Sequence, residues 1–264
     1  MKNLFKHNKP IIACIHLMAL PGSPLYAGNM TAIYDKALEE LDIFKHSGVD
    51  GIIIENFRDK PFYPDKVPAE TIAAMAGIGR EIVKQTNMPV GINILRNDAE
   101  GALAIATAIE AHFIRVTSHL ATVVSEQGLI YGTSYKTLRL RKALDSQVFI
   151  FADVDVKHTV PLAPLGLDIN TQALCQHGLV DAVIVSGKAT GIEVNYKDLE
   201  IVKQNSSVPV FIGSGVTPDN INKISDLADG FIIGSYFKQQ GKANNAVEAS
   251  RVINLITVRN SKVI

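Results

Sequence analysis

Three charged residues alternate along a segment that otherwise has the composition of a buried strand. Asp153, Asp155 and Lys157 share one face of that strand, because side chains alternate between its two faces. Burying unpaired charge is expensive, which indicates a functional role if this face points inward. The lysine can form a Schiff base or donate a proton, and either carboxylate can act as a general base or a metal ligand. An exposed strand end with a surface ion pair is the alternative, and the spacing does not choose among these roles.

Four further polar residues lie in or at the ends of other strand-like runs, and they are His16, Glu55, Asn93 and Arg115. If the strand ends meet at one mouth, these side chains form a ring with Asp153 that can move protons on a substrate. His16, Glu55 and Asp153 can also hold a divalent metal ion, the one cofactor that the chain suggests. No tight ligand motif such as H-x-x-x-H is present, so metal binding stays open.

Glycine and serine follow three apolar runs in the C-terminal half. The candidate anion-binding residues are Ser186, Gly187, Gly213, Ser214, Gly215, Gly234 and Ser235. Glycine lets backbone N–H groups approach a phosphate closely, and a helix N-terminus adds partial positive charge. Tight turns alone are the alternative. Residues 187–191 do not form a P-loop motif, and Lys188 and Lys238 are expected to be solvated.

Strand-like and helix-like segments alternate along the whole chain and would position these residues. Eight apolar runs fall at 11–16, 50–55, 89–95, 112–116, 147–156, 181–185, 208–212 and 230–233. Helical periodicity or helix signals fall at 31–47, 68–85, from 97 or 98, at 134–144, 168–176, from 218, and at 243–258. This alternation, without a break in composition, predicts an α/β protein whose residues 1–264 form one (β/α)₈ TIM-barrel domain. An open doubly wound sheet is the alternative.

A barrel would gather the strand ends at one face, where barrel enzymes carry their active sites. The connection that holds residues 117–119 and 125–132 is long for a barrel loop, which is typical of a lid or an interface.

Composition excludes several classes of protein. The 264 residues are 47% hydrophobic and 20% charged, which excludes a disordered chain or a disulfide scaffold. Lys plus Arg and Asp plus Glu each number 26, so a basic footprint for nucleic acid is absent at the level of the whole chain. No apolar run is long enough for a transmembrane segment, and the N-terminus lacks a signal peptide. We expect a cytoplasmic protein, without a nucleic-acid partner, that forms a homo-oligomer.

Several strings along the chain together resemble the BtpA/SgcQ family. They are HL at 16–17 with LPGSP at 20–24, ENFRDKPF at 55–62, GINILRND at 91–98, FIRV at 113–116, QGLI at 127–130, ADVDVKH at 152–158 and GSGVT at 213–217. The resemblance spans almost the whole length. Two departures stand out, since residues 17–21 lack a further proline and residues 116–119 lack the asparagine usual after Arg115.

The resemblance implies a barrel of the ribulose-phosphate-binding kind. The family takes its name from a factor implicated in photosystem I accumulation or stability, and other members look like partners of sugar-phosphate pathways. No biochemical activity follows from the resemblance.

Two hypotheses of different class result. The first is an enzyme that acts on a small phosphorylated metabolite, such as a sugar phosphate. The glycine-rich strand ends would anchor the phosphate, while the polar ring performs proton transfer, isomerisation or carbon–carbon cleavage. The second is a non-catalytic factor for biogenesis of photosystem I or another membrane complex, which predicts a large apolar patch on the outside of the barrel.

Overall fold

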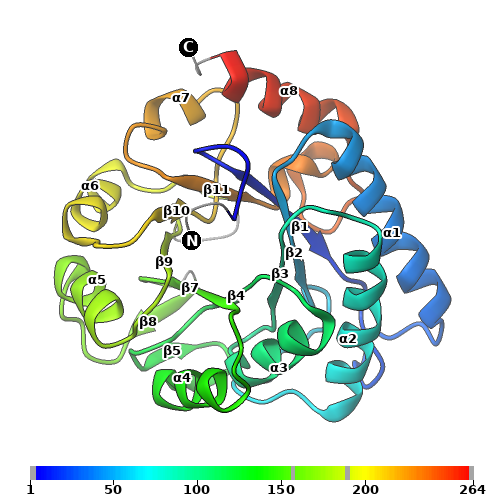
Figure 1. Cartoon of the computed structure of the whole chain (residues 1–264), viewed down its shortest axis with the longest axis horizontal. Helices are drawn as coiled ribbons and strands as arrows, with labels where there is room; N and C mark the ends of the chain where they lie inside the picture. The colour runs from blue at the N-terminus through cyan, green and yellow to red at the C-terminus, as the bar shows by residue number, and fades with distance from the viewer. Residues whose placement is uncertain (1–3, 156–157, 188–190, 262–264) are drawn as a thin grey trace.

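Eight parallel strands close around one axis in a computed structural model that describes residues 4–155, 158–187 and 191–261 (Figure 1). Around the barrel their order is β1-β11-β10-β9-β7-β4-β3-β2. The strands are β1 (Ile11–His16), β2 (Gly51–Glu55), β3 (Val90–Asn93), β4 (Phe113–Val116), β7 (Phe149–Asp153), β9 (Ala182–Val185), β10 (Val210–Ile212) and β11 (Gly230–Ile233). The predicted closed barrel is therefore confirmed, and the open sheet is excluded.

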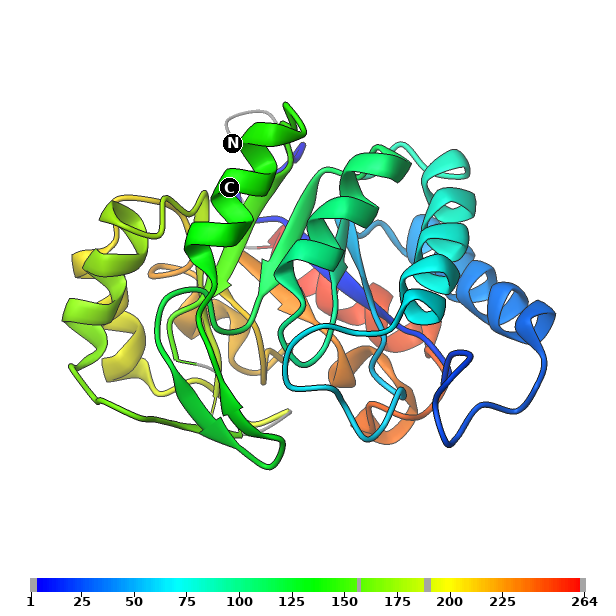
Figure 2. The ribbon, with the colours of Figure 1, turned by 90° about the horizontal axis from the view of Figure 1, so that it is seen from below.

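Helices surround the barrel on its outside (Figures 1 and 2). In the described ranges they are α1 (Met30–Ser47), α2 (Ala69–Lys84), α3 (Ala99–Ile109), α4 (Ser134–Ala143), α5 (Leu167–Gln176), α6 (Tyr196–Asn205), α7 (Ile221–Ile224) and α8 (Ala249–Ser261). The side chain of Asp98, at one of the two predicted helix starts, caps α3 by accepting a hydrogen bond from the Gly101 N–H. No described helix combines the length and apolar character needed to cross a lipid bilayer.

The chain departs from the prediction at several places, and α6 lies where the sequence analysis marked no helix. The shifted boundaries include those of β7 and α8. The fifth strand of the barrel, β7, ends at Asp153 rather than at residue 156. The closing helix α8 begins six residues later than the predicted start at 243. The segment before it instead forms backbone hydrogen bonds within residues 237–248, in which the Gln239 N–H donates to the Ala246 carbonyl and the Glu248 N–H donates to the Phe237 carbonyl. Two short 3₁₀ helices, η1 (Ser235–Phe237) and η2 (Gln239–Gly241), lie there.

A small antiparallel sheet, absent from the prediction, joins two of the connections that follow barrel strands. Its strands are β5 (Val123–Ser125), β6 (Gly128–Ile130) and β8 (Thr159–Pro161), in the order β6-β5-β8. The β5–β6 hairpin forms from the connection that the sequence marked as unusually long, and β8 comes from the segment after β7. Figure 2 shows the hairpin in green, projecting from the side of the molecule opposite the N-terminus.

Inward-facing side chains fill the barrel in layers. Phe113, Phe151 and Phe211 lie inside it, with ring centroids of neighbouring pairs 4.7 and 5.1 Å apart. The absence of a side chain at Gly91 makes room for Phe113, because a Cβ at position 91 would overlap the phenyl ring. Two residues closer to the carboxyl ends of these strands, the inward-facing side chains include Arg115 and Asp153. The candidate site begins there.

The fit between Gly91 and Phe113 gives a test of the layered interior. We expect Gly91→Ala to destabilise the fold by about 1–3 kcal/mol through overpacking, measured by urea denaturation. The matched control is Gly91→Ala/Phe113→Leu, in which the smaller side chain leaves room for the new methyl group and part of the loss is recovered. Equal stability of Gly91→Ala and the wild type would contradict this packing.

Candidate functional site

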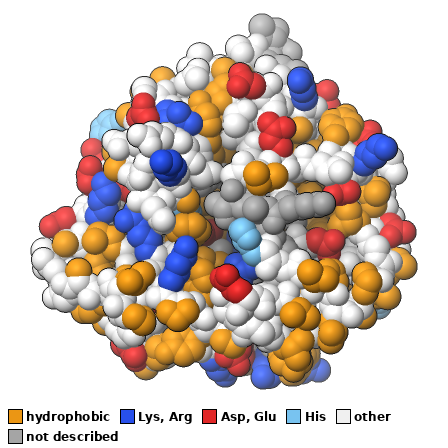
Figure 3. Space-filling view, turned by 180° about the vertical axis from the view of Figure 1, so that it is seen from behind, with side chains coloured by type: hydrophobic (Ala, Val, Ile, Leu, Met, Phe, Trp, Pro, Cys, Tyr) orange, Lys and Arg blue, Asp and Glu red, His pale blue; other side chains and the backbone are white. Residues whose placement is uncertain are grey.

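A cavity of about 260 Å³ opens at the carboxyl ends of the barrel strands. It is lined by inward-facing residues of β1, β2, β3 and β4 on one side and by the segments after β10 and β11 on the other. Figure 3 shows the face opposite the one seen in Figure 1, where a histidine and charged side chains gather near the centre. The predicted mouth of the barrel is therefore a real hollow with polar walls.

The buried guanidinium of Arg115 makes the strongest contacts at this rim. Its Nε and Nη2 each donate a 2.9 Å hydrogen bond to one oxygen of Asp153, on the neighbouring strand β7. The hydroxyl of Ser186 also donates to Asp153, at 2.9 Å. Burial alone would lower the pKa of Arg115, but the charges of Asp153 and Glu55 outweigh it, so this pKa lies above its usual value. Arg115 is therefore a fixed positive charge.

Glu55 connects this pair to the other side of the ring. Its Oε1 accepts a 3.0 Å hydrogen bond from Asn93 Nδ2 and lies 3.8 Å from Arg115 Nη1. Its Oε2 lies 3.7 Å from Nε2 of His16. Strand register explains these contacts, because Glu55 pairs with His16 on one neighbouring strand and with Asn93 on the other.

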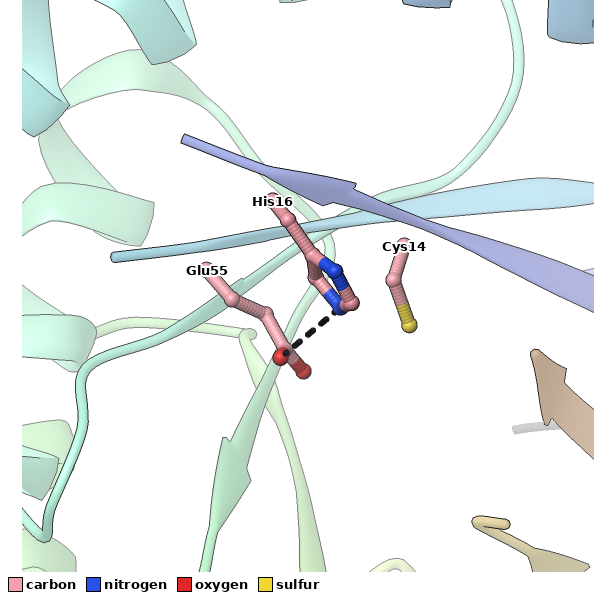
Figure 4. A group of neighbouring side chains, drawn as sticks. All are labelled: Cys14, His16 and Glu55. Atoms are coloured by element: carbon pink, nitrogen blue, oxygen red, sulfur yellow. Dashed lines mark ion pairs between the residues drawn. The ribbon is translucent and has the colours of Figure 1, made fainter. Parts of the chain in front are cut away.

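His16 is oriented by two contacts outside the ring. Its Nδ1 lies 3.1 Å from the carbonyl of Ala243, which can only accept, so Nδ1 carries the proton of this hydrogen bond. The imidazole stacks on Phe57, with ring centroids 4.1 Å apart. Nε2 is left facing Glu55 (Figure 4).

The match to known proteins decides the relationship of the chain. The model of the BtpA family matches residues 7–261. The chain belongs to the BtpA family. It is 42% identical over 249 residues to the photosystem I biogenesis protein BtpA of Synechocystis sp., covering 94% of this chain and 87% of that one. It is equally identical over 261 residues to an uncharacterised protein of Methanocaldococcus jannaschii, covering 97% of each.

A solved structure supports the fold of this BtpA-family chain. Thiamine phosphate pyrophosphorylase from Pyrococcus furiosus superposes with a TM-score of 0.60 at 10% sequence identity, covering 97% of this chain and 98% of that one. At that identity the likeness concerns the barrel alone.

The BtpA-family barrel brings together most of the predicted ring, with two exceptions. His16, Glu55, Asn93, Arg115 and Asp153 meet at the rim, as their strand positions predicted. The prediction that Asp155 shares this inward face is wrong, because β7 ends at Asp153; Asp155 is exposed and accepts a hydrogen bond from Asn170 on α5. Lys157 lies outside the described residues.

The glycine-rich strand ends divide into two groups. Gly213, Ser214, Gly215, Gly234 and Ser235 line the cavity, whereas Ser186 and Gly187 do not contribute to its lining.

Packing between loops explains part of this glycine content. Ser214 Oγ accepts a hydrogen bond from the Gly187 N–H and donates to the Ile192 carbonyl. Gly215 has a φ of +69°, and a Cβ there would overlap the backbone of Glu193. Ser235 also lines the cavity and brings a hydroxyl group to its wall.

Two other sequence expectations need correction or completion. Lys238 is fully buried rather than solvated, because its Nζ donates a 2.7 Å hydrogen bond to Glu40 on α1, and burial lowers the pKa of this lysine. Lys188 lies outside the described residues.

The sequence analysis also missed Cys14. It lies two residues before His16 on the same face of β1, and its Sγ, one nitrogen of His16 and one oxygen of Glu55 lie within 4.8 Å of one another (Figure 4). Asp153, predicted as the third metal ligand, has both oxygens held by Arg115. The signal in the sequence was the spacing of two residues between Cys14 and His16, which places both side chains on one face of a strand.

The pairing of Arg115 with Asp153 gives a stability test. Asp153→Ala leaves the guanidinium buried without its bidentate partner, and we expect a loss of about 3–5 kcal/mol in the free energy of unfolding. The control is Glu39→Ala, which removes an exposed ion pair of the same 2.9 Å length with Lys36 and should cost about 1 kcal/mol or less. A loss no larger than that of the control would show that Asp153 does not neutralise Arg115.

Proposed function

We propose that this protein is an enzyme that acts on a small phosphorylated metabolite, such as a sugar phosphate, by proton transfer at a carbon next to a polar oxygen. Buried acid–base groups and glycine-rich strand ends that line one cavity are the observation that carries the proposal. Isomerisation begins with removal of a proton from the carbon beside a carbonyl group, whereas carbon–carbon cleavage begins with removal of a proton from a hydroxyl group. A base at the cavity wall serves either reaction.

The anion side of the site is formed by the seventh and eighth strands of the barrel, β10 and β11. Barrels frequently bind phosphate with the loops that follow these two strands. Gly215, Gly234 and Ser235 bring backbone and a hydroxyl to the cavity wall there. Lys60 and Arg96 line the same cavity and add positive charge for an anionic ligand.

The reacting side is formed by the first four strands together with β7. Glu55 can remove a proton from a substrate carbon or hydroxyl, because Asn93 and the register of the strands hold its carboxylate toward the cavity. His16 can exchange a proton with the substrate through Nε2. The fixed positive charge of Arg115 can stabilise negative charge that develops on a substrate oxygen. Binding of the remote phosphate would orient the carbon between these groups.

A second candidate function is an assembly role, which one specific observation favours. The small sheet and its flanks expose five large apolar side chains, at 42–67% of their full accessibility. They are Val124, Leu129, Val160, Leu162 and Leu165. Such a patch suits a protein partner, and the Synechocystis relative is named as a photosystem I biogenesis protein. This candidate predicts no stabilisation by phosphorylated sugars.

A thermal-shift screen separates the two functions. The full chain is heated with sugar phosphates and, as matched controls, with the corresponding sugars lacking phosphate. We expect at least one phosphorylated compound to raise the Tm and its unphosphorylated partner to leave it unchanged, since a ligand at 100 times its Kd stabilises by about 2.7 kcal/mol. A panel without any phosphate-dependent shift contradicts the proposed enzyme.

Glu55→Gln tests the reacting side once a substrate is identified. The amide keeps the shape of the side chain but cannot take a proton, so turnover should fall about 10²–10⁴-fold while the thermal shift persists. Glu39→Gln, on the exposed face of α1, serves as the control. Wild-type turnover in Glu55→Gln would remove Glu55 from the mechanism.

A further inference from the structure

Three side chains with metal-binding atoms converge at the rim of the barrel beside the cavity. Cys14, His16 and Glu55 are all buried, and Sγ, a ring nitrogen and a carboxylate oxygen lie within 4.8 Å of one another (Figure 4). Two come from the same face of β1 and the third from the paired position on β2. The backbone of the barrel therefore determines their separation.

Two of the three groups are oriented by neighbouring hydrogen bonds. His16 donates its Nδ1 proton to the Ala243 carbonyl, and Nε2 is the ring nitrogen that lies 3.7 Å from Glu55 Oε2. Metal-binding histidines commonly donate their other ring N–H to a backbone carbonyl in this way. Asn93 holds Oε1 of Glu55, which leaves Oε2 as the oxygen closest to His16.

Gly234, directly after the neighbouring strand β11, leaves space next to these atoms. A Cβ at this position would lie 3.1 Å from His16 Nε2 and 3.6 Å from Cys14 Sγ. Any larger residue would therefore fill the space beside the nitrogen and the sulfur. The observed 3.7 Å between Nε2 and Oε2 is close to the edge of about 3.4 Å that two zinc ligands span in a tetrahedral site.

We propose that Cys14, His16 and Glu55 bind a divalent cation of the zinc class. A thiolate, an imidazole and a carboxylate suit Zn²⁺ or Co²⁺, whereas Mg²⁺ and Ca²⁺ prefer oxygen ligands throughout. Three protein ligands beside a cavity match the pattern of catalytic zinc sites, which keep one position for water or substrate. The cation would also balance the negative charge of the thiolate and the carboxylate in a buried place.

The site goes beyond the proposed function, and only its use in turnover rests on that function. A cation at this place would polarise a substrate oxygen at the cavity wall. Loss of activity in Glu55→Gln fits either a base or a ligand, so activity does not decide the metal site, and the tests below measure binding directly.

Titration of the metal-free full chain with Co²⁺ tests the site. We expect a thiolate-to-cobalt charge-transfer absorption in the near ultraviolet that saturates at one ion per chain. Cys14→Ser should lose this absorption, while Cys175→Ser should keep it, and these are the two cysteines of the sequence. Zn²⁺ should displace the cobalt, and Mg²⁺ should not.

Gly234→Ala tests the geometry with all three ligands intact. The added methyl group would occupy the space beside Nε2 and Sγ, and we expect it to weaken Co²⁺ binding by about 10-fold or more. This variant also decides the question if Cys14→Ser does not fold. An absorption that persists in Cys14→Ser, wild-type Co²⁺ affinity in Gly234→Ala, or no Co²⁺ binding by the wild type would each overturn the proposal.

A chelator separates this proposal from the proposed function. The thermal-shift screen with sugar phosphates is repeated with EDTA on chain that has been freed of metal. A phosphate-dependent shift without any Co²⁺ binding would overturn the metal site and leave the phosphorylated substrate standing. Co²⁺ binding without a phosphate-dependent shift would do the reverse.

Discussion

The rim of this barrel depends on one buried positive charge. The guanidinium of Arg115 lies between Asp153, on the neighbouring strand β7, and Glu55, on β2 two strands away in the other direction. Either carboxylate would be costly to bury without a counter-charge. Gly213 on the far wall contributes to the same arrangement, since a Cβ there would lie 3.2 Å from Arg115 Nη2. Arg96 brings a second guanidinium whose charge acts on Asp153 and Glu55, so two positive charges stand beside the two carboxylates.

The fold was predictable because its signals are local. Continuous apolar runs mark strands that are buried on both faces, and the period of two assigned Asp153 to the inward side. The site was less predictable. Val154 and Val156 continue the β-branched run past the point where the strand ends, so the sequence could not separate Asp155 from Asp153. The partner of Lys238 is Glu40, 198 residues away, and no pattern near Lys238 announces it.

The roles of individual glycines were the hardest to predict from the sequence, because glycine serves several purposes in this barrel. The sequence analysis treated Gly213 and Gly215 as parts of an anion cradle. Gly213 also makes room for Arg115, and Gly215 lets two loops approach. Gly234 stands beside His16 and Cys14. The role of each glycine depends on the atoms it faces, which belong to a distant part of the sequence and include the backbone of a loop in the case of Gly215.

The small sheet β6-β5-β8 ties together two connections that leave different barrel strands. Its central strand β5 follows β4, whereas its edge strand β8 follows β7. Glu126, at the turn of the hairpin, reaches the cavity lining, as does His158 immediately before β8. The two connections are thereby coupled mechanically, so a displacement of the hairpin pulls on the segment beyond Asp153. A change in the length of one connection would then require a matching change in the other, because a change in one alone would break the ladder that joins them.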